Sequence, residues 1–124
     1  MPRTTVVLYQ EEDGSVPFLV WFDGLGEKAQ DKCRVRIERL AELGHELRRP
    51  EADLLRDGIY ELRTKHQRVN SRILYFFHGK EAAVLSHGIT KQQDAVPASE
   101  IERARVLLKR FDADPTRHTY EEPD

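Results

Sequence analysis

The spacing of apolar residues in the first third of the chain predicts one strand and two helices. Thr4–Tyr9 is apolar and β-branched, which indicates a strand. After Pro17, which suits a first helical turn, apolar residues recur at helical spacing up to Leu25. A second helical pattern runs from Glu27 to Leu43 and stops at Gly44. Two helices joined by a short glycine connection form a helical hairpin, whose apolar faces need a sheet to cover.

The pattern then changes to strands, and a final helix follows. After a connector over 47–57, the predicted strands are Gly58–Lys65, Ser71–His78 and Ala82–His87, with turns near 67–70 and 79–80. Residues 88–95 are predicted to be a polar loop, and the last helix opens at Pro97. The order β-α-α-β-β-β-α predicts an α+β fold, with the N-terminal strand and the helical hairpin packed on a small antiparallel sheet, and a C-terminal helix. Residues 1–111 form this domain, and the acidic, proline-containing tail 112–124 is predicted to be mobile.

The strand Ser71–His78 is apolar on both faces, which is typical of a central strand. Side chains alternate between the two faces of a strand, so Arg63 shares a face with Lys65. If Arg63 and Arg72 point to the same face, they are like-charged neighbours on adjacent strands. Such a pair is destabilising unless an anion lies beside it. The spacing alone leaves the register of the two strands open.

Charge is segregated along the chain. The total is −2, yet residues 56–91 carry seven Lys or Arg and only three Asp or Glu. In this segment the cations lie among aromatic residues on predicted strands, which is unusual for a face that only contacts water. The segregation therefore favours a surface that binds an anion such as a phosphodiester backbone.

The composition is that of a soluble globular domain, with 39% hydrophobic and 34% charged residues. The apolar runs are far shorter than a membrane span, and the N-terminus lacks the apolar core of a signal peptide. The single cysteine, Cys33, excludes an internal disulfide and favours a reducing, cytoplasmic location. The sequence contains no cysteine pair and no closely spaced histidine pair, so it predicts no metal site.

The order and spacing of four segments are typical of a known family. The segments are Leu55–Arg63, Asn70–Gly79, Ser86–Lys91 and Pro97–Ala104. Together they resemble the RelE/ParE toxin superfamily, and most of all its HigB-like, often phage-derived branch. The resemblance extends to about Phe111, and it implies the same β-α-α-β-β-β-α order. It also implies a toxin of a type II toxin–antitoxin pair, held in a hetero-oligomer by a cognate helix-turn-helix antitoxin.

The resemblance further implies growth inhibition through cleavage of mRNA, usually on the ribosome, without a metal or other cofactor. In that reaction the ribose 2′-OH attacks the adjacent phosphorus, and basic side chains stabilise the developing charge. Carried over by position, the catalytic cations are Arg63, Arg72 and Lys91. The candidates for proton transfer are His66 and His87, and those for RNA binding are Lys65, Arg68 and His78. A lysine or Glu61 is the other option for the general base, and the choice stays open.

Three features depart from RelE-type toxins. No tyrosine follows Lys91, Glu61 occupies the place of a strand lysine, and the net charge is acidic. These departures favour an alternative function, either a ParE-like inhibitor of DNA gyrase or a catalytically inactive prophage-derived protein that binds its antitoxin. The sequence therefore predicts an endoribonuclease, with a binding protein as the alternative.

Overall fold

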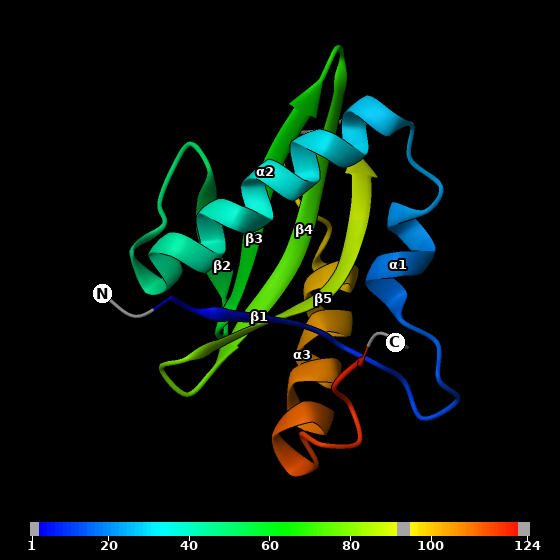
Figure 1. The fold of residues 1–124 in the computed structure, drawn as a ribbon, viewed down its shortest axis with the longest axis vertical. Helices are drawn as coiled ribbons and strands as arrows, with labels where there is room; N and C mark the ends of the chain where they lie inside the picture. Colours follow the sequence, from blue (N-terminus) through cyan, green and yellow to red (C-terminus); the bar gives the residue numbers. More distant parts are fainter. Residues whose placement is uncertain (1–2, 92–94, 122–124) are drawn as a thin grey trace.

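A five-stranded sheet with helices on both faces builds the protein (Figure 1). The structure is a computed structural model that describes residues 3–91 and 95–121, without the side chain of Lys91. Its elements are β1 (Thr5–Leu8), α1 (Pro17–Phe22), α2 (Glu27–Leu43), the 3-10 turn η1 (Gly44–Glu46), β2 (Ala52–Arg56), β3 (Ile59–His66), β4 (Val69–His78), β5 (Ala82–Lys91) and α3 (Ala98–Ala113). The strand order is β1-β5-β4-β3-β2, with β1 parallel to β5 and the other neighbours antiparallel. The predicted α+β class is confirmed, whereas the sheet is mixed rather than purely antiparallel.

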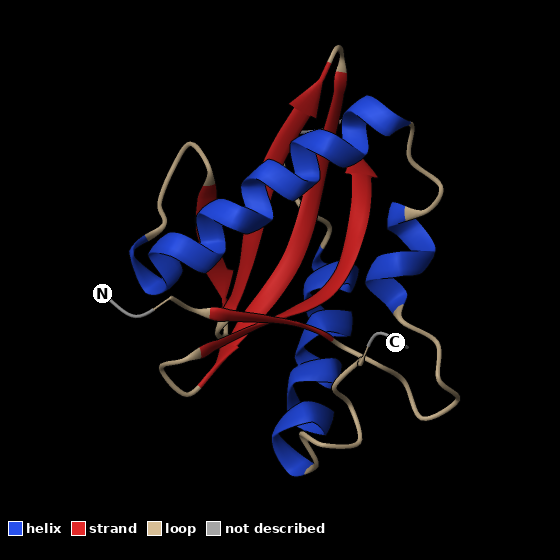
Figure 2. Cartoon of the chain, in the orientation of Figure 1, coloured by secondary structure: helices blue, strands red, loops and turns tan. Residues whose placement is uncertain are grey.

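The helical hairpin forms as the sequence predicts. Pro17 occupies the first turn of α1, where its missing N–H costs nothing. Gly44 ends α2 with a φ of +52°, a conformation that favours glycine, and its N–H donates to the carbonyl of Leu40. Both helices lie on the same face of the sheet, and α3 lies on the opposite face (Figure 2).

Two strand boundaries differ from the prediction. Residues 47–57 were expected to be a connector, but they contain β2, which pairs with β3 through a turn at Asp57 and Gly58. Both turn residues have positive φ angles, as a tight two-residue hairpin needs. The expected polar loop from Gly88 is also wrong at its start, because β5 continues to Lys91. The ladder extends this far because β4 is long enough to pair with β5 back to Asn70.

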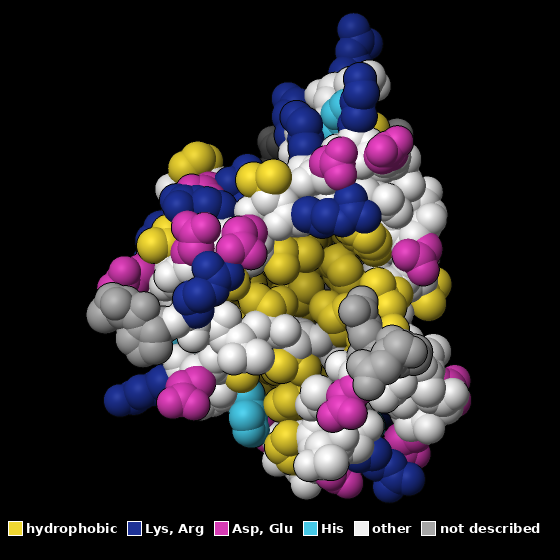
Figure 3. All heavy atoms as spheres, viewed as in Figure 1, with side chains coloured by type: hydrophobic (Ala, Val, Ile, Leu, Met, Phe, Trp, Pro, Cys, Tyr) yellow, Lys and Arg dark blue, Asp and Glu magenta, His cyan; other side chains and the backbone are white. Residues whose placement is uncertain are grey.

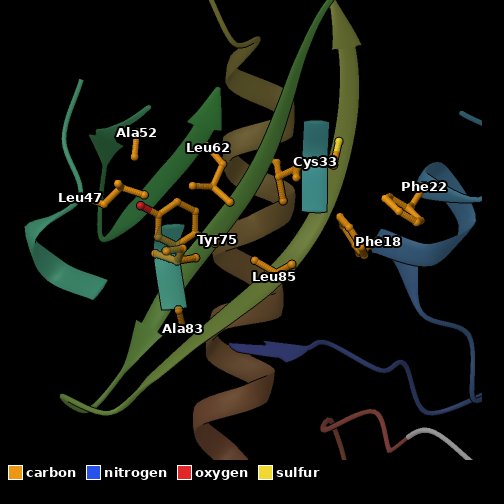
Figure 4. Close-up of a cluster of buried hydrophobic side chains, with 11 residues drawn as sticks. Phe18, Phe22, Cys33, Leu47, Ala52, Leu62, Tyr75, Ala83 and Leu85 are labelled. Atoms are coloured by element: carbon orange, nitrogen blue, oxygen red, sulfur yellow. The ribbon is translucent and has the colours of Figure 1, made fainter. Parts of the chain in front are cut away.

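Two apolar clusters fill the space on either side of the sheet. One lies between the sheet and α1 and α2, and it contains Phe18, Cys33, Leu62 and Tyr75 (Figure 4). The other lies between the sheet and α3. Consecutive residues of β4 contribute to alternate clusters, so the prediction that this strand is central is confirmed.

The segment after α3, which the sequence predicts to be a mobile tail, returns to the sheet in its described part. Thr119 forms an isolated bridge with Tyr9, and the ring of His118 stacks on the ring of Tyr9 with centroids 4.9 Å apart. The N–H of Tyr120 donates to the carbonyl of Leu8. Residues 122–124, the end of the predicted tail, lie outside the described residues.

The part of the chain that the structure describes holds no helix that is both long and apolar enough to cross a membrane.

Candidate anion-binding site

Arg63 and Arg72 face each other across β3 and β4. The register pairs them directly. Ile59 and Leu74 point into the cluster beneath α3, and alternation places Arg63 and Arg72 on that same face. The two arginines are therefore the like-charged cross-strand neighbours that the sequence left open.

The carboxylate of Glu61 lies between these two cations. Its Oε1 is 3.1 Å from Nε of Arg72, and its Oε2 is 3.4 Å from Nη1 of Arg63. The contact with Arg72 is an ion pair rather than an aligned hydrogen bond, and Nη1 of Arg72 also donates to the carbonyl of Ser71. Glu61 and Arg72 are buried, whereas the side chain of Arg63 is 27% exposed. One buried carboxylate thus offsets the repulsion of the pair, and Arg63 is the member that water reaches.

The pair lies beyond the N-terminal end of α3. Glu100 in the first turn of this helix contacts His87, and Asp112 near its end contacts His78. Because His87 is opposite Leu74, α3 runs along β4 from Leu74 to His78, and Arg72 lies beyond the start of the helix although it is buried.

A second row of polar residues follows the arginine pair toward the hairpin turn. Asn70 on β4 is opposite Lys65 on one side and Lys91 on the other. Lys91 was placed in a loop from the sequence, but it ends β5, and its side chain lies outside the description. Arg68 occupies the exposed turn between β3 and β4. Figure 3 shows Lys and Arg side chains gathered at the end of the molecule where this hairpin projects.

The candidate histidines do not converge on the arginine pair. Alternation places His66 on the other face of β3, with Leu62 and Thr64. His78 shares the face of Arg72 but lies six residues along β4, about 20 Å away at the usual rise of a strand. Of the three predicted histidines, only His87 lies near the pair, one diagonal step away across β4 and β5.

His87 is held in a buried chain of polar groups. Its Nδ1 is 2.8 Å from Oγ of Ser86, and its Nε2 is 3.0 Å from Oε1 of Glu100. A carboxylate only accepts, so Nε2 carries the proton and Nδ1 accepts from the Ser86 hydroxyl. Burial, followed by the charge of Arg103, lowers the pKa of His87, although Glu100 opposes the shift. The imidazole is therefore neutral near pH 7, and the fully buried Ser86 is not placed to be a nucleophile.

Comparison with known proteins identifies the family. A family model that describes phage-derived Gp49-like proteins matches residues 20–109, which is most of the chain. The chain belongs to this family. The Gp49-like proteins are RelE-like and toxin-like, and the match runs from α1 into α3 and so contains the arginine pair, Glu61 and His87. A search of curated proteins finds no match.

Two hydrogen-bonding partners of His87 in this Gp49-like chain were not predicted as site residues. Glu100 and Ser86 hold the ring of His87, yet nothing in their spacing places Glu100 opposite a strand. The signal that was available is the helix start at Pro97, which puts Glu100 in a first turn but does not say what the turn faces. Among residues 3–91 and 95–121, no three His, Cys, Asp or Glu side chains gather as a metal site would need.

Proposed function

We propose that this Gp49-like chain is the toxin of a type II toxin–antitoxin pair, of the HigB-like branch, and that it cleaves mRNA on the ribosome. One observation carries the proposal. Arg63 and Arg72 form a paired cationic site on the sheet, in which Arg63 is partly exposed, Glu61 lies between the two arginines, and Lys65 is in the next row. Such a site suits a phosphodiester, because guanidinium groups bind phosphate oxygens with two parallel hydrogen bonds.

The two arginines have different roles in this proposal. Arg63 is partly exposed, so it contacts the scissile phosphate and stabilises the charge that builds up on its oxygens. Arg72 is buried behind Glu61, so it acts as a positioning residue that holds the carboxylate. Lys65, in the row next to Arg63, contacts the leaving 5′-oxygen, and Arg68 in the hairpin turn binds a neighbouring phosphate.

Glu61 is the general base of the proposed reaction, and its Oε2, on the side of the partly exposed Arg63, is the oxygen that the substrate reaches. Its Oε2 takes the proton of the ribose 2′-OH, the 2′-oxygen forms a bond to phosphorus, and the bond from phosphorus to the 5′-oxygen breaks. The leaving 5′-oxygen takes a proton from the ammonium group of Lys65, and a 2′,3′-cyclic phosphate remains. Positioned proton transfer of this kind contributes roughly 10²–10⁴-fold to a rate. The location of His66 on the other face and of His78 at the far end of β4 favours Glu61 over these histidines.

The proposed partners follow from this activity. A helix-turn-helix antitoxin holds the toxin in a hetero-oligomer in the cytoplasm, and the mRNA substrate is bound on the ribosome. Inhibition is expected to act on the cationic face, since an acidic segment laid over Arg63 competes with phosphate.

One observation favours the alternative function. Glu61 already pairs with both arginines, so the cations are internally compensated without RNA. In a gyrase inhibitor or an inactive antitoxin-binding protein, this pair contributes to stability alone.

The deciding experiment maps the 5′ ends of cellular RNA after expression is induced in bacteria. It compares the wild-type chain with Arg63→Ala, Glu61→Gln and Arg72→Lys. Arg34→Ala is the matched control, because Arg34 is an exposed arginine on α2, on the other side of the sheet. Circular dichroism establishes that each variant is folded.

We expect cuts inside translated frames that Arg63→Ala reduces by roughly 10²-fold, as for the loss of a transition-state donor. Arg34→Ala should cut like the wild type, and Arg72→Lys should retain part of the activity because it still offers a cation to Glu61. Growth arrest with intact RNA and broken DNA would replace the proposal with gyrase inhibition. Neither arrest nor cuts would assign the chain to the inactive antitoxin-binding class.

A further inference from the structure

A cleft opens at the edge of the sheet, and neither arginine of the anion-binding pair lines it. β1 pairs only with residues 82–85 of β5, so the second half of β5 has no strand beyond it among the described residues. In its place α1 and α3 flank this edge from opposite faces of the sheet. They enclose a cleft of about 530 Å³, whose wall includes the backbone of Gly88.

The cleft is largely apolar, and its rim is exposed. The apolar lining residues are Pro17, Val20, Trp21, Val106 and Leu107. Val20 is 73% exposed and Val106 is 41% exposed, so both belong to the few large apolar side chains that face water in the described part of the chain. They come from two different helices and meet at one cleft. Apolar side chains gathered in this way mark an interaction surface, whereas a single exposed valine does not.

The charge around the cleft is positive on balance. Its charged lining residues are Arg103, Arg110 and Glu11. Arg110 is 3.6 Å from Glu11, which compensates it in part. Arg103 makes no ion pair with another residue in the described ranges, and His87 at the wall is neutral near pH 7. Among the described residues, one cation without an ion pair therefore stands beside an apolar surface.

We propose that this cleft is a docking site for an acidic amphipathic helix of a partner protein. An apolar side chain of the partner enters the cleft against Trp21, and a neighbouring carboxylate pairs with Arg103. A protein segment fits better than a small molecule, because a helix lying across the cleft covers the exposed rim residues Val20 and Val106 together. The site shares neither arginine of the anion-binding pair, so the inference stands whether or not the chain cleaves RNA.

Trp21 offers a direct measurement, since it is the single tryptophan of the chain and lines the cleft. Its Nε1 donates to Oγ1 of Thr90, 3.1 Å away, which fixes the ring at this edge. The probe is a synthetic helical peptide of Glu and Leu at amphipathic spacing, without Trp or Tyr. The control peptide has Lys in place of every Glu. Emission from Trp21 is recorded while each peptide is titrated into the folded protein.

We expect the Glu peptide to shift Trp21 emission to shorter wavelength and to saturate, and the Lys peptide to bind at least about tenfold more weakly. Arg103→Glu should weaken the Glu peptide by a similar factor. Lys109→Glu, the same change at an exposed position of α3 outside the cleft lining, should not. Val20→Asp should abolish the shift, whereas Val35→Asp on α2, also exposed, should leave it intact.

Equal binding of the two peptides would overturn the proposal. So would equal losses in Arg103→Glu and Lys109→Glu, because the effect would then be one of net charge. A saturable shift that survives Val20→Asp would place the peptide elsewhere on the surface.

Discussion

Arg63 and Arg72 occupy one register position on neighbouring strands and share the carboxylate of Glu61. Two guanidinium groups at this separation repel each other, and the repulsion is stronger for the buried Arg72 than it would be in water. The protein therefore contains its own anion at the place where the proposed function requires a phosphate. Stability and anion binding should be linked through Glu61.

Glu61→Gln should destabilise the fold and make it responsive to added anions. Removal of one charge from a buried ion pair costs about 3 kcal/mol or more, because the partner cation remains buried. Sulfate should then restore part of the loss by binding between Arg63 and Arg72. The measurement is urea unfolding of the variant in sodium sulfate and in sodium chloride of equal ionic strength.

The control for this variant is Glu38→Gln. Glu38 pairs with Arg3 on the exposed surface, and such a pair contributes little to stability. Equal responses of both variants to sulfate would mean that the anion acts by general salting-out and not at the arginine pair.

His87 should make the fold less stable in mild acid. Burial lowers its pKa below the ordinary value of 6.5, so the unfolded chain binds the proton more readily than the folded chain. The stability from this group is complete above pH 6.5 and is lost as the pH falls from there through the pKa of the folded state. The free energy of unfolding from urea titrations between pH 5 and pH 8 measures the slope.

His87→Gln should flatten that slope, because an amide does not titrate. His66→Gln is the matched control, since it removes a partly exposed histidine from the same sheet. If the slope is unchanged in His87→Gln and smaller in His66→Gln, the acid sensitivity comes from His66, and the prediction for His87 is wrong.

The sequence was sufficient for the fold where local signals and burial agreed. Pro17 and Gly44 mark helix ends by backbone chemistry, and β4 is apolar on both faces because it is buried on both. The sequence was not sufficient for β2, a short edge strand whose two leucines, Leu54 and Leu55, are exposed or partly exposed. The Asp57-Gly58 turn was the available signal for that hairpin.

The site was predictable in its cations but not in its geometry. Alternation allowed Arg63 and Arg72 to share a face, but only the register decides it, and register depends on pairing along the whole hairpin. The contact between Glu100 and His87 joins a helix to a strand far apart in the chain. The packing of α3 on the sheet sets this contact, and no local pattern contains it.

Gly88→Ala should destabilise the edge of the sheet where α1 packs. A Cβ at this position would overlap the ring of Trp21, which lies directly on the glycine. Overpacking of this kind costs about 1–3 kcal/mol. Gly24→Ala is the control, because its Cβ would make an ordinary contact of 3.5 Å. The melting temperature and the emission of Trp21 are measured for both glycine variants and for the wild type. Equal melting temperatures for Gly88→Ala and the wild type would show that the ring moves aside at no cost.

His118 should anchor the turn that follows α3 to the end of β1. Its ring stacks on that of Tyr9 at an interplanar angle of 7°, and its Nδ1–H donates to the carbonyl of Gln10 over 2.8 Å. His118→Ala removes both contacts and should cost about 2 kcal/mol in urea unfolding, as the sum of a stacked pair and a hydrogen bond. The amide of Tyr120, which donates to Leu8, should exchange its hydrogen faster in the variant.

Arg117→Ala, at the exposed neighbouring position, should change neither the free energy of unfolding nor the exchange rate at Tyr120. Unaltered exchange at Tyr120 in His118→Ala would mean that the backbone bridge between Tyr9 and Thr119 holds this segment without the ring.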